Sequence, residues 1–112
     1  MAPDTFRYNY HDSRVQGIQI GPRREVTLDI SLDSVWNGGE AIIARIRFGG
    51  IQNYAEVSAY FQSMSPSEER MIEEIILLKK TGKQSWSLEL DPAGLICIKC
   101  LNVEESGLYP VK

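Results

Sequence analysis

Two cysteines, Cys97 and Cys100, are separated by two residues, a spacing found in dithiol redox sites and in zinc sites. The residues around them alternate as in a β-strand, where an offset of three positions places two side chains on opposite faces. Their Cα atoms would then lie about 10 Å apart, beyond the span of a disulfide. The chain has one histidine and no second C-x-x-C pair to complete a zinc site. We therefore predict ordinary strand cysteines, with no metal and no cofactor.

The segment His11-Asp12-Ser13 contains the three residue types of a hydrolase triad. Adjacent side chains diverge, so three consecutive residues cannot form a triad among themselves. The chain also has no G-x-S-x-G elbow to present a serine. The better interpretation is a turn closed by Asp12 or Ser13 through the backbone. We assign no catalytic residue and keep a pocket near His11 and Asp12 as the alternative.

The composition limits the partners of the chain. Its 112 residues carry a net charge of -3, and Arg23-Arg24 is its nearest approach to a basic cluster. Nucleic acid normally requires a basic surface, so it is not an expected partner. No apolar run approaches the ~18 residues that span a bilayer, so no membrane partner is expected. Two cysteines and no export signal indicate a cytoplasmic protein.

Short segments of alternating apolar and polar residues, closed by Gly, Pro, Asn or Asp, predict β-strands. The clearest are Val26 to Leu32 and Ser85 to Asp91. Further strands are predicted at residues 15–20, 41–48, 51–61 and 95–101, with an arm or edge strand at 6–10. In the ambiguous stretch from Ile51 to Phe61, alternation of Val57, Ala59 and Phe61 favours a strand.

The stretch from Ser65 to Gly82 carries conflicting signals. Ser65-Pro66-Ser67-Glu68 is a capping box, which predicts a helix start. The apolar run Ile75-Ile76-Leu77-Leu78 and the turn after it favour a strand that forms a hairpin. We predict a short helix from Pro66 to Met71 followed by a strand from Glu73 to Lys80. One long helix from Pro66 to Lys80 is the alternative.

These elements predict a mainly β protein with a single domain over residues 1–112. The expected architecture is an antiparallel sheet of about six or seven strands, either a sandwich or a partly open barrel, with one short helix. The alternative is an α+β fold in which the long helix packs on the sheet. Residues 1–5 and 106–112 are expected to be extended tails.

The polar faces of the strands provide the candidate binding residues. Arg45 and Arg47 face away from the core and are expected beside Asp29 on the neighbouring strand. Such a face can hold cross-strand ion pairs, or it can meet a carboxylate of a partner. Trp36 and Tyr60, expected to be exposed, are residue types favoured at interfaces.

The order of these features resembles a diffuse group of small β-rich bacterial proteins. The resemblance lies in Tyr10-His11-Asp12-Ser13, in Arg45-Ile46-Arg47-Phe48-Gly49-Gly50-Ile51, and in the closing segment from Leu95 to Cys100. Some members of the group resemble immunity proteins of polymorphic toxin systems. The resemblance implies a protein-binding role, supports a strand near Ile75, and transfers no catalytic residue.

Our leading hypothesis is therefore a non-catalytic protein-interaction module that resembles immunity proteins and binds another protein or its own copy. The second hypothesis is a small-ligand binder or enzyme with a pocket near His11. The third is a structural subunit that assembles into homo-oligomers through strand edges.

Overall fold

A computed structural model describes residues 10–21, 23–32, 42–62, 74–91 and 94–110. Within these ranges the chain forms one seven-stranded antiparallel sheet of order β6-β5-β4-β1-β2-β3-β7, together with the helix α1. The mainly β class and the antiparallel sheet predicted from the sequence are confirmed. The elements are β1 Arg14–Gly21, β2 Glu25–Ser31, β3 Ile42–Gly49, α1 Tyr54–Gln62, β4 Glu74–Gly82, β5 Ser85–Asp91, β6 Gly94–Lys99 and β7 Asn102–Pro110.

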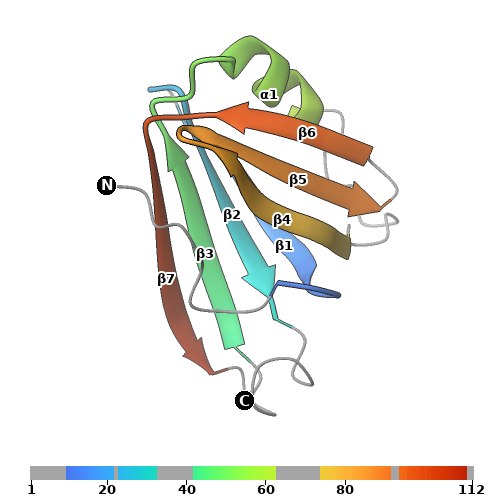
Figure 1. Ribbon diagram of the computed structural model, residues 1–112. Helices are drawn as coiled ribbons and strands as arrows, with labels where there is room; N and C mark the ends of the chain where they lie inside the picture. Colours follow the sequence, from blue (N-terminus) through green and yellow to red (C-terminus); the bar gives the residue numbers. More distant parts are fainter. Residues whose placement is uncertain (1–9, 22, 33–41, 63–73, 92–93, 111–112) are drawn as a thin grey trace.

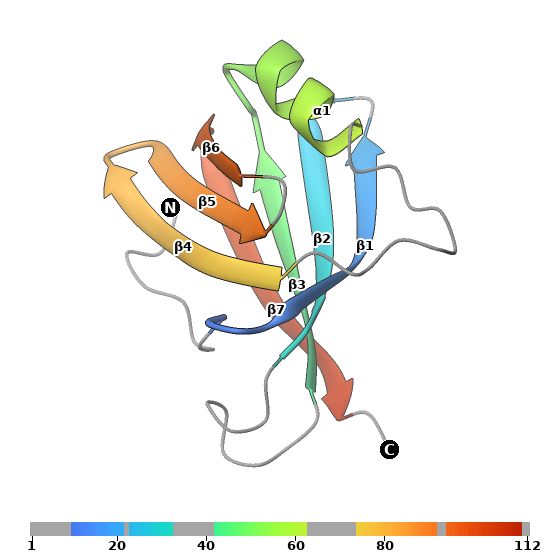
Figure 2. The same cartoon turned by 90° about the vertical axis from the view of Figure 1, so that its right-hand side faces the viewer.

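The sheet curls into a half-barrel around a core made from alternate residues of its strands (Figures 1 and 2). Val26, Leu28 and Ile30 of β2 are fully buried, as their alternation predicts. They lie opposite Phe48, Ile46 and Ala44 of β3, which are also fully buried. On the other wing of the half-barrel, β5 contributes Trp86, Leu88 and Leu90. The core is therefore formed between two ribbons of strands whose inner faces oppose each other.

The prediction of a strand through residues 51–61 is wrong, because this segment contains the helix α1. Asn53 begins the helix: its carbonyl accepts the backbone N–H of Val57 at 3.0 Å. Val57 and Phe61, one turn apart, are 0% and 2% exposed, whereas Ala59 between them is exposed. Residues four apart share a helix face, and residues two apart do not.

Helix α1 covers one end of the half-barrel (Figure 1). Its tyrosines bond to strand ends on both sides of it. The hydroxyl of Tyr54 donates to the carbonyl of Gly21 at the end of β1 at 3.0 Å, and that of Tyr60 donates to Gly94 at the start of β6 at 2.6 Å. The helix therefore ties the two wings of the half-barrel together at this end.

The strand predicted from Glu73 to Lys80 is confirmed by β4. The alternative of one helix from Pro66 to Lys80 is wrong, because β4 pairs with β5 from Glu74 onward. The apolar run Ile75-Ile76-Leu77-Leu78 lies in β4, where Ile75 is fully buried. The short helix predicted from Pro66 to Met71 lies outside the described residues.

Strand β7 corrects the prediction of an extended tail over 106–112. It pairs with β3 as far as Pro110, and Ser106 and Gly107 lie opposite Arg45 and Ala44. Residues 1–5 and 111–112 lie outside the described residues. The last strand is therefore part of the sheet, at the edge opposite β6.

Candidate functional site

The outer face of β2, β3 and β7 carries the arginines singled out from the sequence. Arg45 lies directly opposite Asp29, as predicted. Its Nε donates to Asp29 Oδ1 at 2.7 Å, and a second nitrogen donates to Oδ2 at 3.3 Å. Arg47 pairs with Glu25 on β2 and lies 3.6 Å from Glu104 on β7. This face is therefore a network of cross-strand ion pairs.

This network leaves little free charge for a partner. Both arginines already have carboxylate neighbours, and their side chains are 42% and 46% exposed. Exposed pairs of this kind contribute a few tenths of a kcal/mol up to ~1 kcal/mol each to stability. A carboxylate from another protein would have to compete with Asp29, Glu25 or Glu104. The geometry favours the structural interpretation of Arg45, Arg47 and Asp29.

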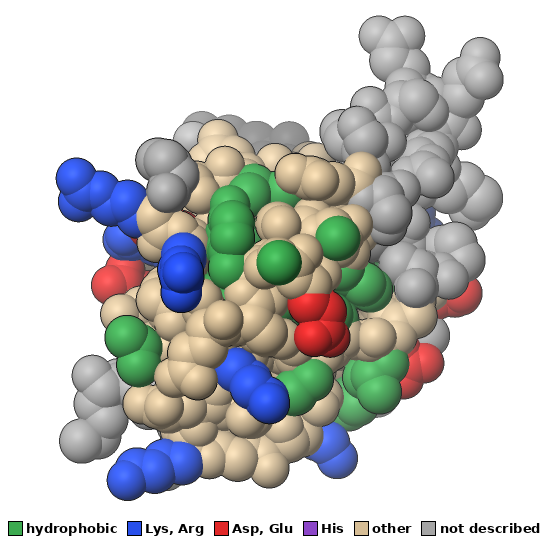
Figure 3. All heavy atoms as spheres, turned by 90° about the horizontal axis from the view of Figure 1, so that it is seen from above, with side chains coloured by type: hydrophobic (Ala, Val, Ile, Leu, Met, Phe, Trp, Pro, Cys, Tyr) green, Lys and Arg blue, Asp and Glu red, His purple; other side chains and the backbone are tan. Residues whose placement is uncertain are grey.

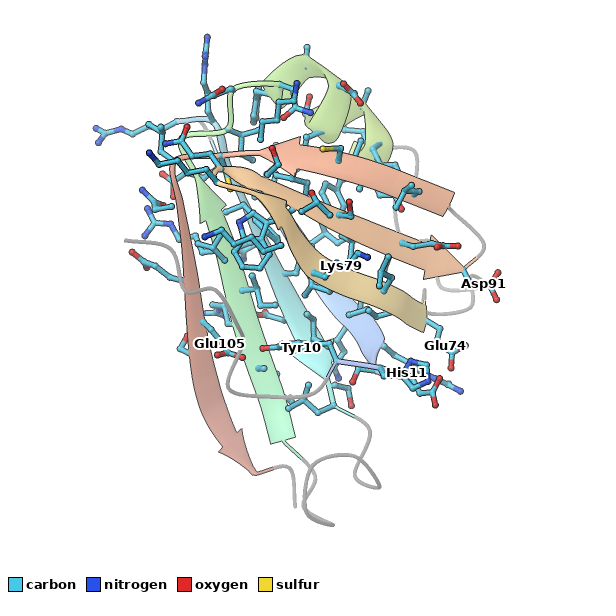
Figure 4. All side chains as sticks on the ribbon, viewed as in Figure 1. Tyr10, His11, Glu74, Lys79, Asp91 and Glu105 are labelled. Carbon is cyan, nitrogen blue, oxygen red and sulfur yellow. The ribbon has the colours of Figure 1, made fainter. Side chains whose placement is uncertain are left out.

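The predicted exposure of Tyr60 is wrong, and Tyr10 is buried as well. Tyr60 is partly buried, its hydroxyl is bonded to Gly94, and its ring packs edge-on against Phe61 at 5.2 Å. Tyr10 is 5% exposed, and its hydroxyl donates to Glu105 Oε2 at 2.6 Å (Figure 4). Both rings belong to the packing of the half-barrel. Trp36 lies outside the described residues.

His11 and Asp12 lie in the predicted turn at the start of β1. The backbone N–H of Ser13 donates to the carbonyl of Tyr10 at 3.1 Å, and Asp12 has a φ of 62°. His11 Nε2 lies 3.5 Å from Asp12 Oδ1, and the two side chains are 52% and 44% exposed. Figure 4 shows His11 at the periphery of the molecule. The positions of His11 and Asp12 are those of an exposed turn, and their exposure does not support a pocket at these two residues.

The two cysteines are both free thiols in different surroundings. Cys97 is partly buried and alternates with the inward-facing Ile96 and Ile98, so it lies on the outer face of β6. Cys100, just beyond the strand, is 2% exposed. Burial raises the pKa of the Cys100 thiol to about 11. Such a thiol is a poor nucleophile and a poor metal ligand at neutral pH.

Because the pKa of the Cys100 thiol is raised, we predict that the protein becomes less stable at alkaline pH. The pKa of an ordinary thiol is 9.0 and burial raises that of folded Cys100 to about 11, so an unfolded chain with the ordinary value loses the thiol proton first as the pH rises. The free energy of unfolding is unaffected by this thiol below pH 9. It falls as the pH rises from 9 to 11, and it is lower by about 1.4 kcal/mol at pH 10. Urea unfolding at pH 8 and pH 10 measures this loss, with Cys100→Ala as control. An equal loss in Cys100→Ala would contradict the prediction.

Four exposed cations gather at the end of the half-barrel that α1 adjoins. Backbone hydrogen bonds bring four connections together there, namely β1–β2, β3–α1, β4–β5 and β6–β7. The N–H of Ile51 donates to the carbonyl of Arg24, and the N–H of Gln52 donates to that of Lys99. The N–H of Cys100 donates to the carbonyl of Gln84, the neighbour of Lys83 in the β4–β5 turn. We call this surface the basic end and define it by Arg23, Arg24, Lys83, Lys99 and Leu101.

Leu101 adds an apolar group to the basic end. It is 56% exposed, and its backbone N–H donates to the carbonyls of Gly49 and Gly50 at 3.1 and 3.3 Å. Figure 3 looks onto this end and shows basic side chains spread over it with hydrophobic side chains between them. Glu56 in the first turn of α1 is the exposed carboxylate of the adjoining helix. Among the described residues, Leu95 and Leu101 are the exposed large hydrophobic side chains, and single exposed residues of this kind are common on protein surfaces.

The four cations of the basic end differ from Arg45 and Arg47 in having no ion-pair partner among the residues that the structure describes. Within the described ranges, none of their side chains forms an ion pair or hydrogen bond. Their charges are therefore not neutralised by a direct ion pair within the described residues, and Glu56 is the carboxylate of the adjoining helix. A group of unpaired cations of this kind produces a local positive potential in a chain whose net charge is -3.

Sequence reasoning identified Arg23-Arg24 but did not connect them with Lys83 and Lys99. These residues lie far apart along the chain, and only the strand order brings their connections together. Each is a basic residue in or beside a turn, which is common on any protein surface. The β4–β5 turn was predicted from the sequence, whereas the β6–β7 turn and the convergence of the connections were not.

A comparison of the chain with models of known protein families, with curated proteins and with solved structures found no significant match. In the part of the chain that the structure describes, no helix has the length and hydrophobicity to cross a membrane.

Proposed function

We propose that this chain is a non-catalytic protein-binding module whose basic end docks on an acidic surface of a partner protein. The observation that supports this function is the convergence of Arg23, Arg24, Lys83 and Lys99, all exposed and without ion pairs among the described residues. Long-range attraction by such a patch raises association rates, and Leu101 supplies apolar contact after docking. A toxin with an acidic surface is one such partner, as the resemblance to immunity proteins implies.

The two sheet edges give less support to assembly through strand edges. At β6, the Asn53 side chain donates to the carbonyl of Cys97 at 2.7 Å and accepts the N–H of Lys99 at 2.9 Å. Strand β7 carries Glu104, whose side chain is 67% exposed, together with Gly107 and Pro110. Capping groups, charge and proline are means by which proteins prevent pairing between edges. We therefore favour binding to a different protein over self-assembly at β6 or β7.

Single charge reversals test the proposed function. A partner co-purified from native lysate is identified by mass spectrometry, expressed alone and titrated against the purified variants. Lys99→Glu is expected to raise the Kd about tenfold at low salt, and Arg23→Glu likewise, because each replaces attraction with repulsion. The matched control is Arg14→Glu, an exposed arginine at the opposite end of β1. The effect of Lys99→Glu should shrink at high salt.

Three results would argue against the proposed function. One is the absence of any stoichiometric protein partner. Another is equal weakening by Arg14→Glu and Lys99→Glu, which would mean that the basic end is not the contact surface. The third is recovery of nucleic acid instead of protein with the wild-type chain but not with Lys99→Glu.

A further inference from the structure

The strand registers define the outer face of the wing that β4, β5 and β6 form. Each of its two central rows contains one residue from each strand, and the rows are Leu77, Glu89, Leu95 and Lys79, Ser87, Cys97. Residues directly opposite in an antiparallel pair share a face, and Leu88 and Leu90, which flank Glu89 in β5, are buried. The side chains of both rows therefore point away from the core. We call this surface the outer wing face.

The charged residues of the outer wing face are sorted by sign along the strands. Figure 4 shows Glu74 and Asp91 together at one end of β4 and β5, with Lys79 farther along β4. Arg14 of β1 lies opposite Glu74, beside this end. We call the two ends the carboxylate end and the lysine end. From one to the other, the charged residues are Glu74 and Asp91, then Glu89, then Lys79, then Lys83 and Lys99.

The charges of the outer wing face are not used within the fold. In the part of the chain that the structure describes, none of the three carboxylates and three lysines forms a side-chain ion pair or hydrogen bond. The outer face of the other wing differs, because Arg45 and Arg47 pair there with carboxylates on neighbouring strands. Lys79 and Lys99 are exposed, and Glu89 is partly exposed. The sorted charges can therefore act on another molecule.

Apolar side chains lie between the two charged ends. Leu95 is 64% exposed, and Leu77, two strands away, is partly exposed. Neighbouring strands are about 4.8 Å apart, so the two leucines lie about 10 Å from each other across Glu89. A uniformly acidic protein would be repelled by the carboxylate end. A complementary surface needs apolar groups at its centre and the same charges in the reverse order.

A second copy of the chain provides that reverse order. A two-fold axis in the plane of the face and perpendicular to the strands places the carboxylate end of each copy over the lysine end of the other. With the axis between the two central rows, Glu89 lies within about one strand spacing of Lys79 of the second copy. Leu95 then faces Cys97 of the second copy. An axis parallel to the strands would bring like charges together, so charge selects the perpendicular axis.

We propose that this chain forms a weak symmetric dimer by packing the outer wing face of one copy against that of another. The face extends about 20 Å along β5 and is three strands wide, which gives roughly 300 Å² per copy. A stable complex buries roughly 800 Å² per partner, so this dimer forms at high chain concentration and low salt. The contact is between faces and leaves the edges of β6 and β7 unpaired. It goes beyond the proposed function, which concerns a different protein.

Sedimentation equilibrium of the wild-type chain measures the association. At low salt, the average mass should rise from that of a monomer toward twice that value between about 0.02 and 1 mM chain. The rise should be smaller at high salt, because salt screens the contacts between the charged ends. A monomeric mass over the whole range at low salt would overturn the inference.

Two charge reversals test the orientation of the copies. Lys79→Glu and Glu89→Lys should each raise the Kd of the dimer about tenfold or more, because each dimer contains the reversed contact twice. An equimolar mixture of the two variants should recover a Kd within about threefold of the wild-type value. One variant then has carboxylates at both positions and the other has ammonium groups. Each reversal changes the net charge of -3 by two, to -5 and -1, so overall attraction cannot explain the recovery.

The matched controls are Arg23→Glu and Glu104→Lys, two exposed charges outside the outer wing face. Alone or mixed, they should change the Kd of the dimer by less than about twofold. Thermal unfolding of each variant verifies that it is folded. Weakening by Arg23→Glu as strong as that by Lys79→Glu, or no recovery in the mixture, would contradict the proposed dimer. Lys79 and Glu89 lie outside the basic end, so neither result bears on the proposed function.

Discussion

Replacing Phe61 by alanine should lower the free energy of unfolding by about 3–5 kcal/mol, the usual cost of removing a buried phenylalanine ring. Phe61 is 2% exposed and holds α1 against the core together with Val57. A domain of this size is stable by only about 5–15 kcal/mol, so the loss would be a large fraction of the total. Urea unfolding, followed by tryptophan fluorescence, measures the change.

The control for this prediction separates helix from strand. In α1, Ala59 is exposed between Val57 and Phe61, so Ala59→Asp should cost less than about 1 kcal/mol, mainly in helix propensity. In a strand, Ala59 would share the buried face with both residues, and a buried carboxylate would unfold the domain. A severe effect of Ala59→Asp, or a loss below about 1.5 kcal/mol for Phe61→Ala, would contradict the observed packing.

The sequence misled at α1 for a geometric reason. Val57 and Phe61 are four residues apart, an offset that fits both one helical turn and two periods of a strand. The small Ala59 between them is compatible with either a helix or a strand. The informative signal was Asn53-x-x-Glu56, which combines a residue favoured at the N-cap with a glutamate three positions later. Read with Tyr54 and Val57, three residues apart, it predicts the helix.

Strands with one buried face and one solvent-exposed face were predictable residue by residue. Val26, Leu28 and Ile30 alternate with polar residues, and the β2–β3 pairing then places Arg45 opposite Asp29. Strand β7 lacks this alternation. Its Glu105 lies opposite the buried Ile46 and is bonded to Tyr10, so a carboxylate occupies a position where the pattern expects an apolar residue. This exception made the strand resemble a polar tail.

The candidate site was less predictable than the fold because it depends on strand order. The outer-face arginines follow from alternation within single strands, and they are paired with carboxylates. The basic end arises where the β1–β2, β4–β5 and β6–β7 connections meet. Pairings between strands distant in sequence determine this convergence. Local periodicity therefore predicts the faces of the strands better than it predicts the ends of the half-barrel.

Replacing Gly50 by valine should destabilise the fold by roughly 2–5 kcal/mol and also disturb the basic end. Gly50 has a φ of +61°, where a side chain costs about 1–2 kcal/mol and a β-branched one more. An added Cβ would lie 2.9 Å from Leu101 Cδ1 and 3.0 Å from its Cβ and Cγ. Forcing atoms into such a contact adds about 1–3 kcal/mol. Chemical unfolding measures the first effect, and titration with the partner measures the second.

A double-mutant cycle separates backbone strain from the contact with Leu101. Gly50→Ala carries the added Cβ, and Leu101→Ala removes Cγ and Cδ1 from its neighbourhood. Because Leu101 is 56% exposed, its truncation alone should cost less than about 1 kcal/mol. Gly50→Ala should then be about 1 kcal/mol less destabilising in the Leu101→Ala background than in the wild-type chain. Equal costs in both backgrounds would mean that the contact contributes nothing. Gly50→Asn should be milder than Gly50→Val, because asparagine tolerates this φ.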